Sequence, residues 1–233
     1  MANWNALFAD ELHVQRVPES EIYRFIALLE KTFSDRPLRI WDIGCGAGRH
    51  TVAMALLGHD VYASDNAPRG LELTRHWLAE RDVSAQVVQS EMTHNPWPSV
   101  TFHGVLGWDA LHHNRIANIY ASLRMIWDAL LPGGMLLATL KSDKADLFGQ
   151  GNEIEPKTFV LTTGSETGVP HHYFDEAELR ALLKGWTILA LCEQVITNVE
   201  RPDKFWEYTP FPHTTWGVLV QKPLAVHDGN ASI

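Results

Sequence analysis

The sequence IWDIGCGAGRH, residues 40–50, is the most informative stretch of this 233-residue chain. An apolar run leads into a glycine-rich turn, and a helical pattern follows. Glycines at alternate positions let the backbone turn sharply with positive φ and let a ligand approach main-chain atoms where a Cβ would collide. The first amides of the helix then face that ligand. The stretch therefore predicts a strand, a turn and a helix that build a nucleotide-sized pocket.

Two classes of ligand use such a turn, and the spacing of the glycines distinguishes them. A dinucleotide-binding loop, G-x-G-x-x-G, places its third glycine or an alanine at position 49, where this chain has Arg49. The strand also ends in Asp42, a carboxylate that repels a pyrophosphate and attracts a cation. A ligand with a sulfonium and an amino group fits this pocket better. An NAD-dependent oxidoreductase is the alternative by analogy of fold.

The loop resembles the first motif of the class I S-adenosylmethionine (SAM)-dependent methyltransferases, which reads acidic-x-Gly-x-Gly-x-Gly. The wider resemblance covers roughly residues 38–141. Arg49 follows the glycines directly, so it either forms an ion pair on the first helical turn or reaches the carboxylate of the cofactor. The loop residues implied to bind the cofactor are Asp42, Gly44, Cys45, Gly46 and Gly48.

Two further motifs resemble the ribose and adenine contacts of the same family. Residues 61–66, VYASDN, are a short apolar run that ends in Asp65 and Asn66. The resemblance implies that Asp65 binds the ribose diol through both hydroxyls, and Asn66 beside it is also expected to contact the cofactor. In the next strand motif, VVQSEM, it implies that Glu91 and Met92 flank the adenine. An exposed acid and a core methionine are the alternative reading of that pair.

The fourth and fifth motifs complete the resemblance. FHGVLGWDALHH, residues 102–113, resembles the fourth strand and the loop after it, with His103 where the family usually has aspartate. The resemblance adds Gly107 and Trp108 to the cofactor contacts. LLPGGMLL, residues 130–137, resembles the helix end, turn and fifth strand of the family. The five motifs in order are far more specific than any one of them.

Histidines supply the candidates for catalysis. In this family the loop after the fourth strand lies near the transferable methyl, so His112 or His113 is expected to face the substrate. His171 precedes a capped helix, in a loop that could close over the same pocket. The alternative for each is an ordinary hydrogen bond in a loop or at a helix entry. Adjacent histidines point apart on a regular element, and no pair has metal-site spacing, so no metal centre is predicted.

The alternation of strands and helices predicts an α/β fold with a Rossmann-like, doubly wound, mostly parallel seven-stranded sheet. Helices are expected on both faces, and the last strand is expected to be antiparallel. Asn114 is expected to cap a helix that ends at the turn 132–134, and a strand over 135–140 follows. Asp175 and Glu178 resemble a capping box. Other expected strands lie near 38–43, 61–64, 86–89, 187–196 and 215–221, and other expected helices lie near 22–33, 48–57 and 69–80.

One domain over residues 1–222 is expected, with a tail at 223–233. Residues 1–35 would form an N-terminal cover and helix, in which Trp4 and Phe8 either lie over the cofactor or simply anchor the segment. Residues 142–172 are irregular in pattern, apart from a possible β-ribbon at 158–162. A loop of that length is typical of a lid, so a lid-like insertion is predicted.

Composition limits the partners. The net charge of −9 and the pI near 5.7 argue against a nucleic-acid backbone as the main partner. Cys45 and Cys192 form no C-x-x-C pair, and the N-terminus lacks the pattern of a signal peptide. No apolar run is long enough to span a membrane. We therefore expect a cytoplasmic protein with no membrane partner, whose oligomeric state the sequence leaves open.

These patterns favour a SAM-dependent methyltransferase that acts on a small molecule. A nucleophile would attack the sulfonium methyl in line, leaving S-adenosylhomocysteine, and a dehydrated, aligned pocket would accelerate this step without a strong acid or base. The ending Gly-Arg-His and the overall size resemble methyltransferases of the tellurite-resistance type. A SAM-binding regulatory protein without catalysis is the other alternative, beside the oxidoreductase.

Overall fold

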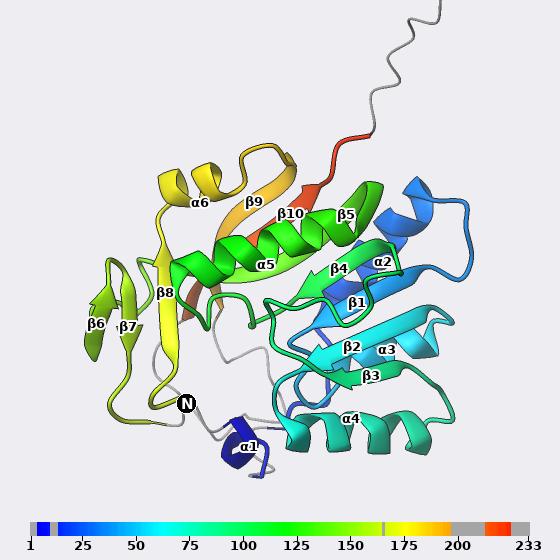
Figure 1. The fold of residues 1–233 in the computed structure, drawn as a ribbon, viewed down its shortest axis with the longest axis horizontal. Helices are drawn as coiled ribbons and strands as arrows, with labels where there is room; N and C mark the ends of the chain where they lie inside the picture. The colour runs from blue at the N-terminus through cyan, green and yellow to red at the C-terminus, as the bar shows by residue number, and fades with distance from the viewer. Residues whose placement is uncertain (1–3, 10–13, 165, 197–212, 225–233) are drawn as a thin grey trace, which may run out of the picture.

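A twisted, mostly parallel sheet forms the centre of the computed structural model, which describes residues 4–9, 14–164, 166–196 and 213–224 (Figure 1). Five parallel strands lie side by side in the order β3-β2-β1-β4-β5. Their bounds are β1 Arg39–Ile43, β2 Asp60–Asp65, β3 Gln86–Gln89, β4 Phe102–Gly107 and β5 Leu130–Ser142.

Two long strands complete the sheet beyond β5. β10, His213–Gln221, is antiparallel to β5 and to β9, Thr187–Ile196. The order β3-β2-β1-β4-β5-β10-β9 confirms the predicted seven strands with a reversed last strand. Three short strands, β6 Asn152–Glu155, β7 Thr158–Val160 and β8 Pro170–Phe174, extend the sheet where β8 pairs with the end of β5.

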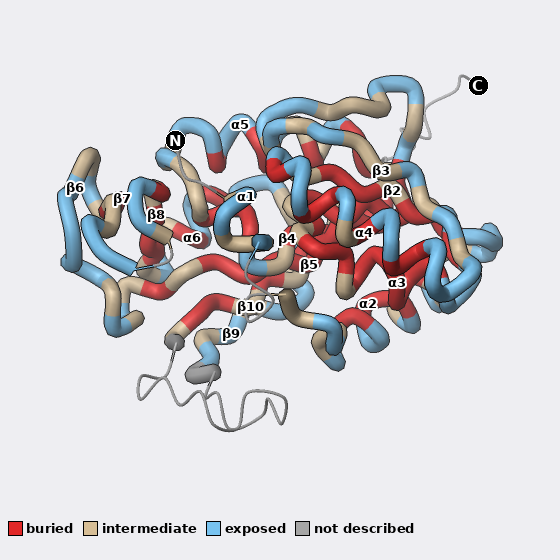
Figure 2. Tube along the Cα trace, turned by 90° about the horizontal axis from the view of Figure 1, so that it is seen from below, coloured by how far each residue is buried: buried red, intermediate tan, exposed pale blue. Residues whose placement is uncertain are grey.

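Helices cover both faces of the sheet, as predicted. α5, Ile116–Ala129, and α6, Glu176–Leu182, pack on one face. α2, Ser20–Thr32, α3, Arg49–Leu56, and α4, Pro68–Glu80, pack on the other. Buried residues accordingly concentrate along the strands and the inner sides of these helices (Figure 2).

The sequence explains why each strand joins two cores. Side chains alternate along a strand, so Trp41 and Ile43 belong to the cluster under α5, whereas Ile40 belongs to the cluster under α2. On α2 the apolar residues recur at helical spacing, which places Ile22 and Leu29 on one fully buried stripe. Burying each such side chain contributes about 1.5–3 kcal/mol.

The start of α5 corrects the predicted cap. The N-cap is Arg115, not Asn114, and Asn114 Oδ1 instead accepts a hydrogen bond from the side chain of Asn118 at 2.7 Å. The amide of Ile116 donates to Glu155 Oε1 at 2.6 Å. A carboxylate from β6 therefore caps this helix, because it supplies an acceptor that the local sequence does not.

The end of α5 also differs from the prediction. The helix ends at Ala129, and β5 begins directly at Leu130 rather than at residue 135. Gly133, with φ of +80°, donates its amide hydrogen to Lys222 O at 2.9 Å. The turn 132–134 thus lies within the extended segment, and its hydrogen bonds go to the end of β10.

The segment 142–172 is more ordered than its pattern suggests. It contains β6 and β7 and reaches the start of β8, and β7 overlaps the predicted ribbon at 158–162. At α6, Asp175 accepts the amide hydrogen of Glu178 at 2.7 Å, which is one of the two hydrogen bonds of a capping box. The carboxylate of Glu178 pairs with Lys157 and His172, at 3.1 and 3.3 Å. In the part of the chain that the structure describes, no helix is long and apolar enough to cross a bilayer.

Candidate functional site

A cavity of about 650 Å³ opens at the carboxyl ends of the parallel strands. This is where ligands bind in open α/β sheets, and the volume lies in the range of small-molecule sites. Its walls come from the glycine loop, the ends of β2 and β3, the loop after β4, the segment before β8 and the N-terminal helix α1, Trp4–Leu7. Seven of the sequence-predicted site residues line it: Gly44, Gly46, Asp65, Asn66, Glu91, Met92 and His113.

The glycine loop contributes main chain rather than side chains. Gly44 has φ of +71°, and a Cβ there would lie 2.4 Å from Ala110 Cβ. Gly46 has φ of +54°, and a Cβ there would lie 3.0 Å from Phe8 Cζ. Both positions therefore require glycine, for conformation and for space. The loop leaves a short stretch of bare backbone on the cavity wall.

Asp65 is the most constrained carboxylate of this wall. Its Oδ2 accepts the amide hydrogen of Gly46 at 2.9 Å, and its Oδ1 accepts that of Ala67 at 2.8 Å. Burial raises its pKa, while these backbone hydrogen bonds oppose the rise. Each oxygen has further lone-pair capacity, so the carboxylate keeps two acceptor positions for a ligand.

Asp42 lies beneath the loop and not in the cavity. The side chain is 1% exposed, and Oδ2 accepts a hydrogen bond from Thr51 Oγ1 at 2.6 Å. Burial, the largest effect, raises the pKa of this carboxyl from 3.8 to about 7, against the hydrogen bond from Thr51. The contact joins the end of β1 to the first turns of α3, so Asp42 acts on the loop from below.

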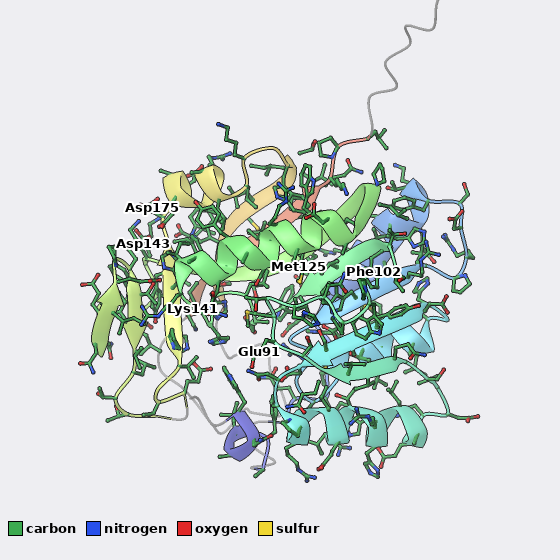
Figure 3. All side chains as sticks on the ribbon, in the orientation of Figure 1. Glu91, Phe102, Met125, Lys141, Asp143 and Asp175 are labelled. Atoms are coloured by element: carbon green, nitrogen blue, oxygen red, sulfur yellow. The ribbon has the colours of Figure 1, made fainter. Side chains whose placement is uncertain are left out.

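Glu91 and Asn66 face the cavity from neighbouring strand ends. Asn66 Nδ2 donates to Glu91 Oε2 at 3.4 Å, and Glu91 is visible below the ends of the strands in Figure 3. Met92 packs partly against the core cluster under α5 and also lines the cavity. The acid, the amide and the thioether together form a half-polar wall.

Besides Asp42, five predicted cofactor residues do not line the cavity. Arg49 is engaged elsewhere: its guanidinium pairs with Glu19 at 2.9 Å, donates to Gln15 and lies 3.9 Å from Asp109 Oδ2. The others pack against the protein interior, with Cys45 near Leu71, Gly48 near Thr74, Gly107 near Leu111 and Trp108 edge-on to His50.

Trp4 and Phe8 lie along the cavity, together with Asn5. The indole of Trp4 contacts the ring of His113 edge-on, with ring centroids 4.9 Å apart. Asn5 Oδ1 accepts the amide hydrogen of Arg69 at 3.0 Å, which attaches this segment to the start of α4. The N-terminal residues therefore form one wall of the cavity.

The three candidate histidines lie together, but only His113 lines the cavity. His112 and His113 lie in an irregular loop, where the expectation for a regular element does not apply, and their ring centroids are 4.1 Å apart. Burial lowers the pKa of both well below the ordinary value. His112 Nδ1 lies 3.4 Å from Thr139 O, and His113 Nδ1 is buried without a hydrogen-bond partner among the described residues.

Two carboxylates near these histidines escaped the sequence analysis. Glu166 pairs with His171 Nε2 at 2.7 Å. Burial raises the pKa of Glu166, but the hydrogen bond to His171 and the nearby positive charges lower it more, so the pKa lies well below the usual range. Asp109 lines the cavity. Thr139 Oγ1 accepts the amide hydrogen of Asp109 at 2.8 Å and donates its own hydrogen to Asp109 Oδ1 at 3.0 Å. Only Asp109 had a local signal, since it stands inside the fourth motif.

Comparison with known proteins agrees with this geometry. A methyltransferase-domain family matches residues 40–134. The ubiquinone biosynthesis O-methyltransferase of Methylocella silvestris is 31% identical over 131 residues, which cover 53% of this chain and 50% of that protein. A tRNA 5-carboxymethoxyuridine methyltransferase of Escherichia coli is 30% identical over 108 residues, or 42% of this chain and 38% of that protein. The chain thus matches half or less of these curated relatives.

The fold is also found among solved structures. A SAM-dependent methyltransferase from Methanosarcina mazei superimposes with a TM-score of 0.68 at 17% identity, covering 84% of this chain and 97% of that one. Identity this low speaks for the fold alone. The sequence match spans β1 to β4 and the start of β5, and the segments at the carboxyl ends of β1 to β4 line the cavity.

Proposed function

We propose that this chain is a class I SAM-dependent methyltransferase that transfers the methyl group of SAM to a small-molecule nucleophile, and the match of residues 40–134 to a methyltransferase-domain family supports the proposal. One observation carries the proposal: the bare backbone at Gly46 and the carboxylate of Asp65 are hydrogen-bonded to each other on the wall of one cavity. This pairing offers a close main-chain approach and two acceptors for a diol at the same place.

The described residues fit the cofactor. Asp65 would hold the ribose hydroxyls, and Glu91 with Met92 would hold the adenine. Gly44 and Gly46 would allow the amino-acid part of the cofactor to lie against the main chain. When bound, SAM supplies a methyl group that is activated by its positively charged sulfur. Asp42, beneath the loop, holds β1 and α3 in the arrangement that these contacts need.

The remaining end of the cavity would receive the acceptor. It is bounded by His113 and Asn114 from the loop after β4 and by residues 168–170 before β8. Trp4 and Val169 add apolar surface, which excludes water and aligns the acceptor for displacement in line. Of the three predicted catalytic histidines, we assign the contact with the acceptor to His113, and we place His112 and His171 behind it.

The acceptor is proposed to be small and partly apolar. Apolar and neutral groups bound this end of the cavity, and the chain carries a net charge of −9, which opposes a polyanion. The names of the relatives refer both to ubiquinone biosynthesis and to tRNA, so both kinds of acceptor belong in the test.

Calorimetry and methyl transfer test the proposal together. We expect SAM and S-adenosylhomocysteine to bind and NAD to give no heat of association. Labelled methyl from SAM should then appear in members of a panel of small phenols, carboxylic acids and thiols, and not in bulk tRNA. Label in tRNA would overturn the small-molecule acceptor. Tight SAM binding without transfer to any acceptor would favour a regulatory protein, and binding of NAD alone would favour the oxidoreductase.

A further inference from the structure

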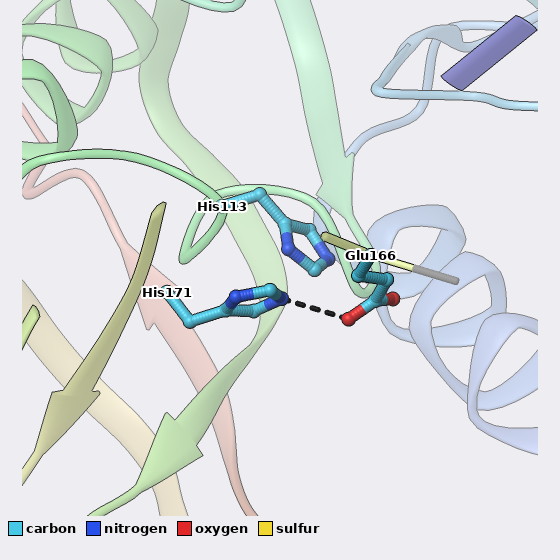
Figure 4. A group of neighbouring side chains, drawn as sticks. All are labelled: His113, Glu166 and His171. Carbon is cyan, nitrogen blue, oxygen red and sulfur yellow. Dashed lines mark hydrogen bonds and ion pairs between the residues drawn. The ribbon is translucent and has the colours of Figure 1, made fainter. Parts of the chain in front are cut away.

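Three metal-ligating side chains meet at the wall of the cavity. His113 comes from the loop after β4, and Glu166 comes from the segment between β7 and β8 (Figure 4). His171 lies in β8 itself, not in the loop that the sequence suggested. One nitrogen or oxygen atom of each lies within 4.8 Å of those of the other two. Two segments distant in sequence thus bring a pair of imidazoles and a carboxylate to one point.

Hydrogen bonding selects the nitrogen of His171 that faces the centre of the cluster. Nδ1 lies 3.1 Å from Val169 O, and a carbonyl oxygen only accepts, so Nδ1 carries a hydrogen. In the neutral ring Nε2 then bears a lone pair, and it lies 2.7 Å from Glu166 Oε2. Two lone-pair atoms this close need a proton between them, and a metal ion could take the place of that proton. With the ion about 2.0–2.2 Å from each atom in tetrahedral geometry, the two atoms would move apart to roughly 3.4 Å. A backbone carbonyl that orients an imidazole in this way is the usual second contact of a metal-bound histidine.

His113 supplies an independent observation. Its Nδ1 is buried and has no hydrogen-bond partner among the described residues. A buried polar atom without a partner destabilises the folded state, because it has lost its hydrogen bonds to water and gained none within the protein. Figure 4 shows its ring turned toward His171 and Glu166. A metal ion between the three side chains would bind to this nitrogen or to Nε2 of the same ring.

We propose that His113, Glu166 and His171 bind one divalent transition-metal ion of the zinc class. Two imidazoles and one carboxylate are a donor set that suits such ions, and three protein ligands leave a fourth position open. Because His113 lines the cavity, the open position faces the space assigned to the acceptor. The ion would also fasten the segment before β8 to the loop after β4.

The role of the ion rests on the proposed function, although the site itself does not. An acceptor oxygen or sulfur bound at the open position would lose its proton to solvent and remain as the anion. That anion is the nucleophile that methyl transfer requires. The cluster would therefore select acceptors with an acidic hydroxyl, carboxyl or thiol group.

The positive charge of Lys141 allows a test in which a substitution should strengthen metal binding. Lys141 lies at the end of β5 (Figure 3), and its positive charge acts on both Glu166 and His112. An ammonium group repels a divalent ion. Lys141→Met should therefore tighten metal binding, whereas loss of a ligand should weaken it.

Calorimetric titration of the metal-free full chain with zinc chloride tests the site. We expect one ion per chain in the wild type and at least a hundredfold weaker binding in Glu166→Gln and His171→Asn. His76→Asn, on the exposed side of α4, is the matched control and should bind like the wild type. Circular dichroism establishes that each variant is folded.

Nitrogen NMR of the histidine rings supplies the second measurement. With zinc, His171 should show a hydrogen on Nδ1 only. The proposal is overturned if the wild type binds no zinc, if Glu166→Gln binds it unchanged, or if His171 keeps hydrogens on both nitrogens in excess zinc, since the cluster would then be an imidazolium–carboxylate pair. SAM calorimetry on the same samples separates the two proposals. If SAM binds but zinc does not, only the metal site is contradicted. If zinc binds but SAM does not, only the methyltransferase site is contradicted.

Discussion

The Asp65 carboxylate accepts the amide hydrogen of Gly46 at 2.9 Å, so the end of β2 is fastened to the loop that follows β1. The other carboxylate oxygen is fastened to Ala67 at 2.8 Å. The acid is thus oriented before any ligand arrives, and little side-chain freedom remains to be lost on binding.

Asp65→Ala should weaken SAM binding by about 1–3 kcal/mol, the scale of hydrogen bonds to a charged acceptor, or roughly ten- to a hundredfold in affinity. Calorimetric titration with SAM measures the change. Asp60→Asn alters an exposed carboxylate at the other end of the same strand and should have no effect. Equal affinities of wild type and Asp65→Ala would remove the acid from the ribose contact.

Gly46→Ala should abolish SAM binding while the protein stays folded. The position has φ of +54° and faces the cavity, so a methyl group there adds strain of about 1–2 kcal/mol and occupies the wall. Gly58→Ala is the matched control, because φ is +82° and nothing lies within 4 Å of an added Cβ. Gly46→Ala should lose at least as much stability as Gly58→Ala in urea unfolding, because its Cβ also meets Phe8 Cζ at 3.0 Å, and only Gly46→Ala should lose the cofactor. Retained affinity would contradict the close approach of the ligand to this backbone.

Asp42 should make stability depend on pH. Its folded pKa of about 7 exceeds the ordinary 3.8, so both states hold the proton below pH 3.8. Between these values the unfolded chain ionises and the folded chain does not, and stability falls as pH rises, by up to about 4 kcal/mol at 1.36 kcal/mol per pKa unit. Asp42→Asn should lack this loss. The free energies of unfolding of both proteins at pH 4 to 8 give the difference, and a difference that is constant with pH would show that the carboxyl is ionised throughout.

Glu155→Ala should lower the free energy of unfolding by about 1 kcal/mol, the usual loss for a helix cap. The carboxylate accepts from Ile116 N at 2.6 Å and from Thr158 Oγ1 at 3.1 Å. For a domain of this size the melting temperature should fall by about 2–4 °C. Glu72→Ala, an exposed acid on α4, is the comparison that should change little. Equal melting temperatures of Glu155→Ala and wild type would mean that solvent caps α5 as well as Glu155 does.

The elements that the sequence predicts well are those specified by neighbours along the chain. Apolar residues at helical spacing define α2, and the alternation of apolar runs with glycine turns defines β1 to β4 within a few residues. The wall formed by Gly46, Asp65 and Glu91 follows from motifs that end parallel strands, because those ends meet at one edge of the sheet.

Contacts between distant segments account for what the sequence does not reveal. Glu155 caps a helix that begins 39 residues earlier. Arg49 could have bound a ligand or another side chain, and the structure pairs it with Glu19, 30 residues away. Glu166 has no motif of its own, and it becomes a partner of His113 only because β8 lies beside the end of β5. Such pairs are set by topology, not by local pattern.

The N-terminal wall of the cavity has a consequence for turnover. α1 spans four residues and has no buried side chain, yet Trp4 and Asn5 close one side of the cavity. If the cavity holds SAM as proposed, displacement of α1 would open this side for exchange of the cofactor while the strands keep their positions.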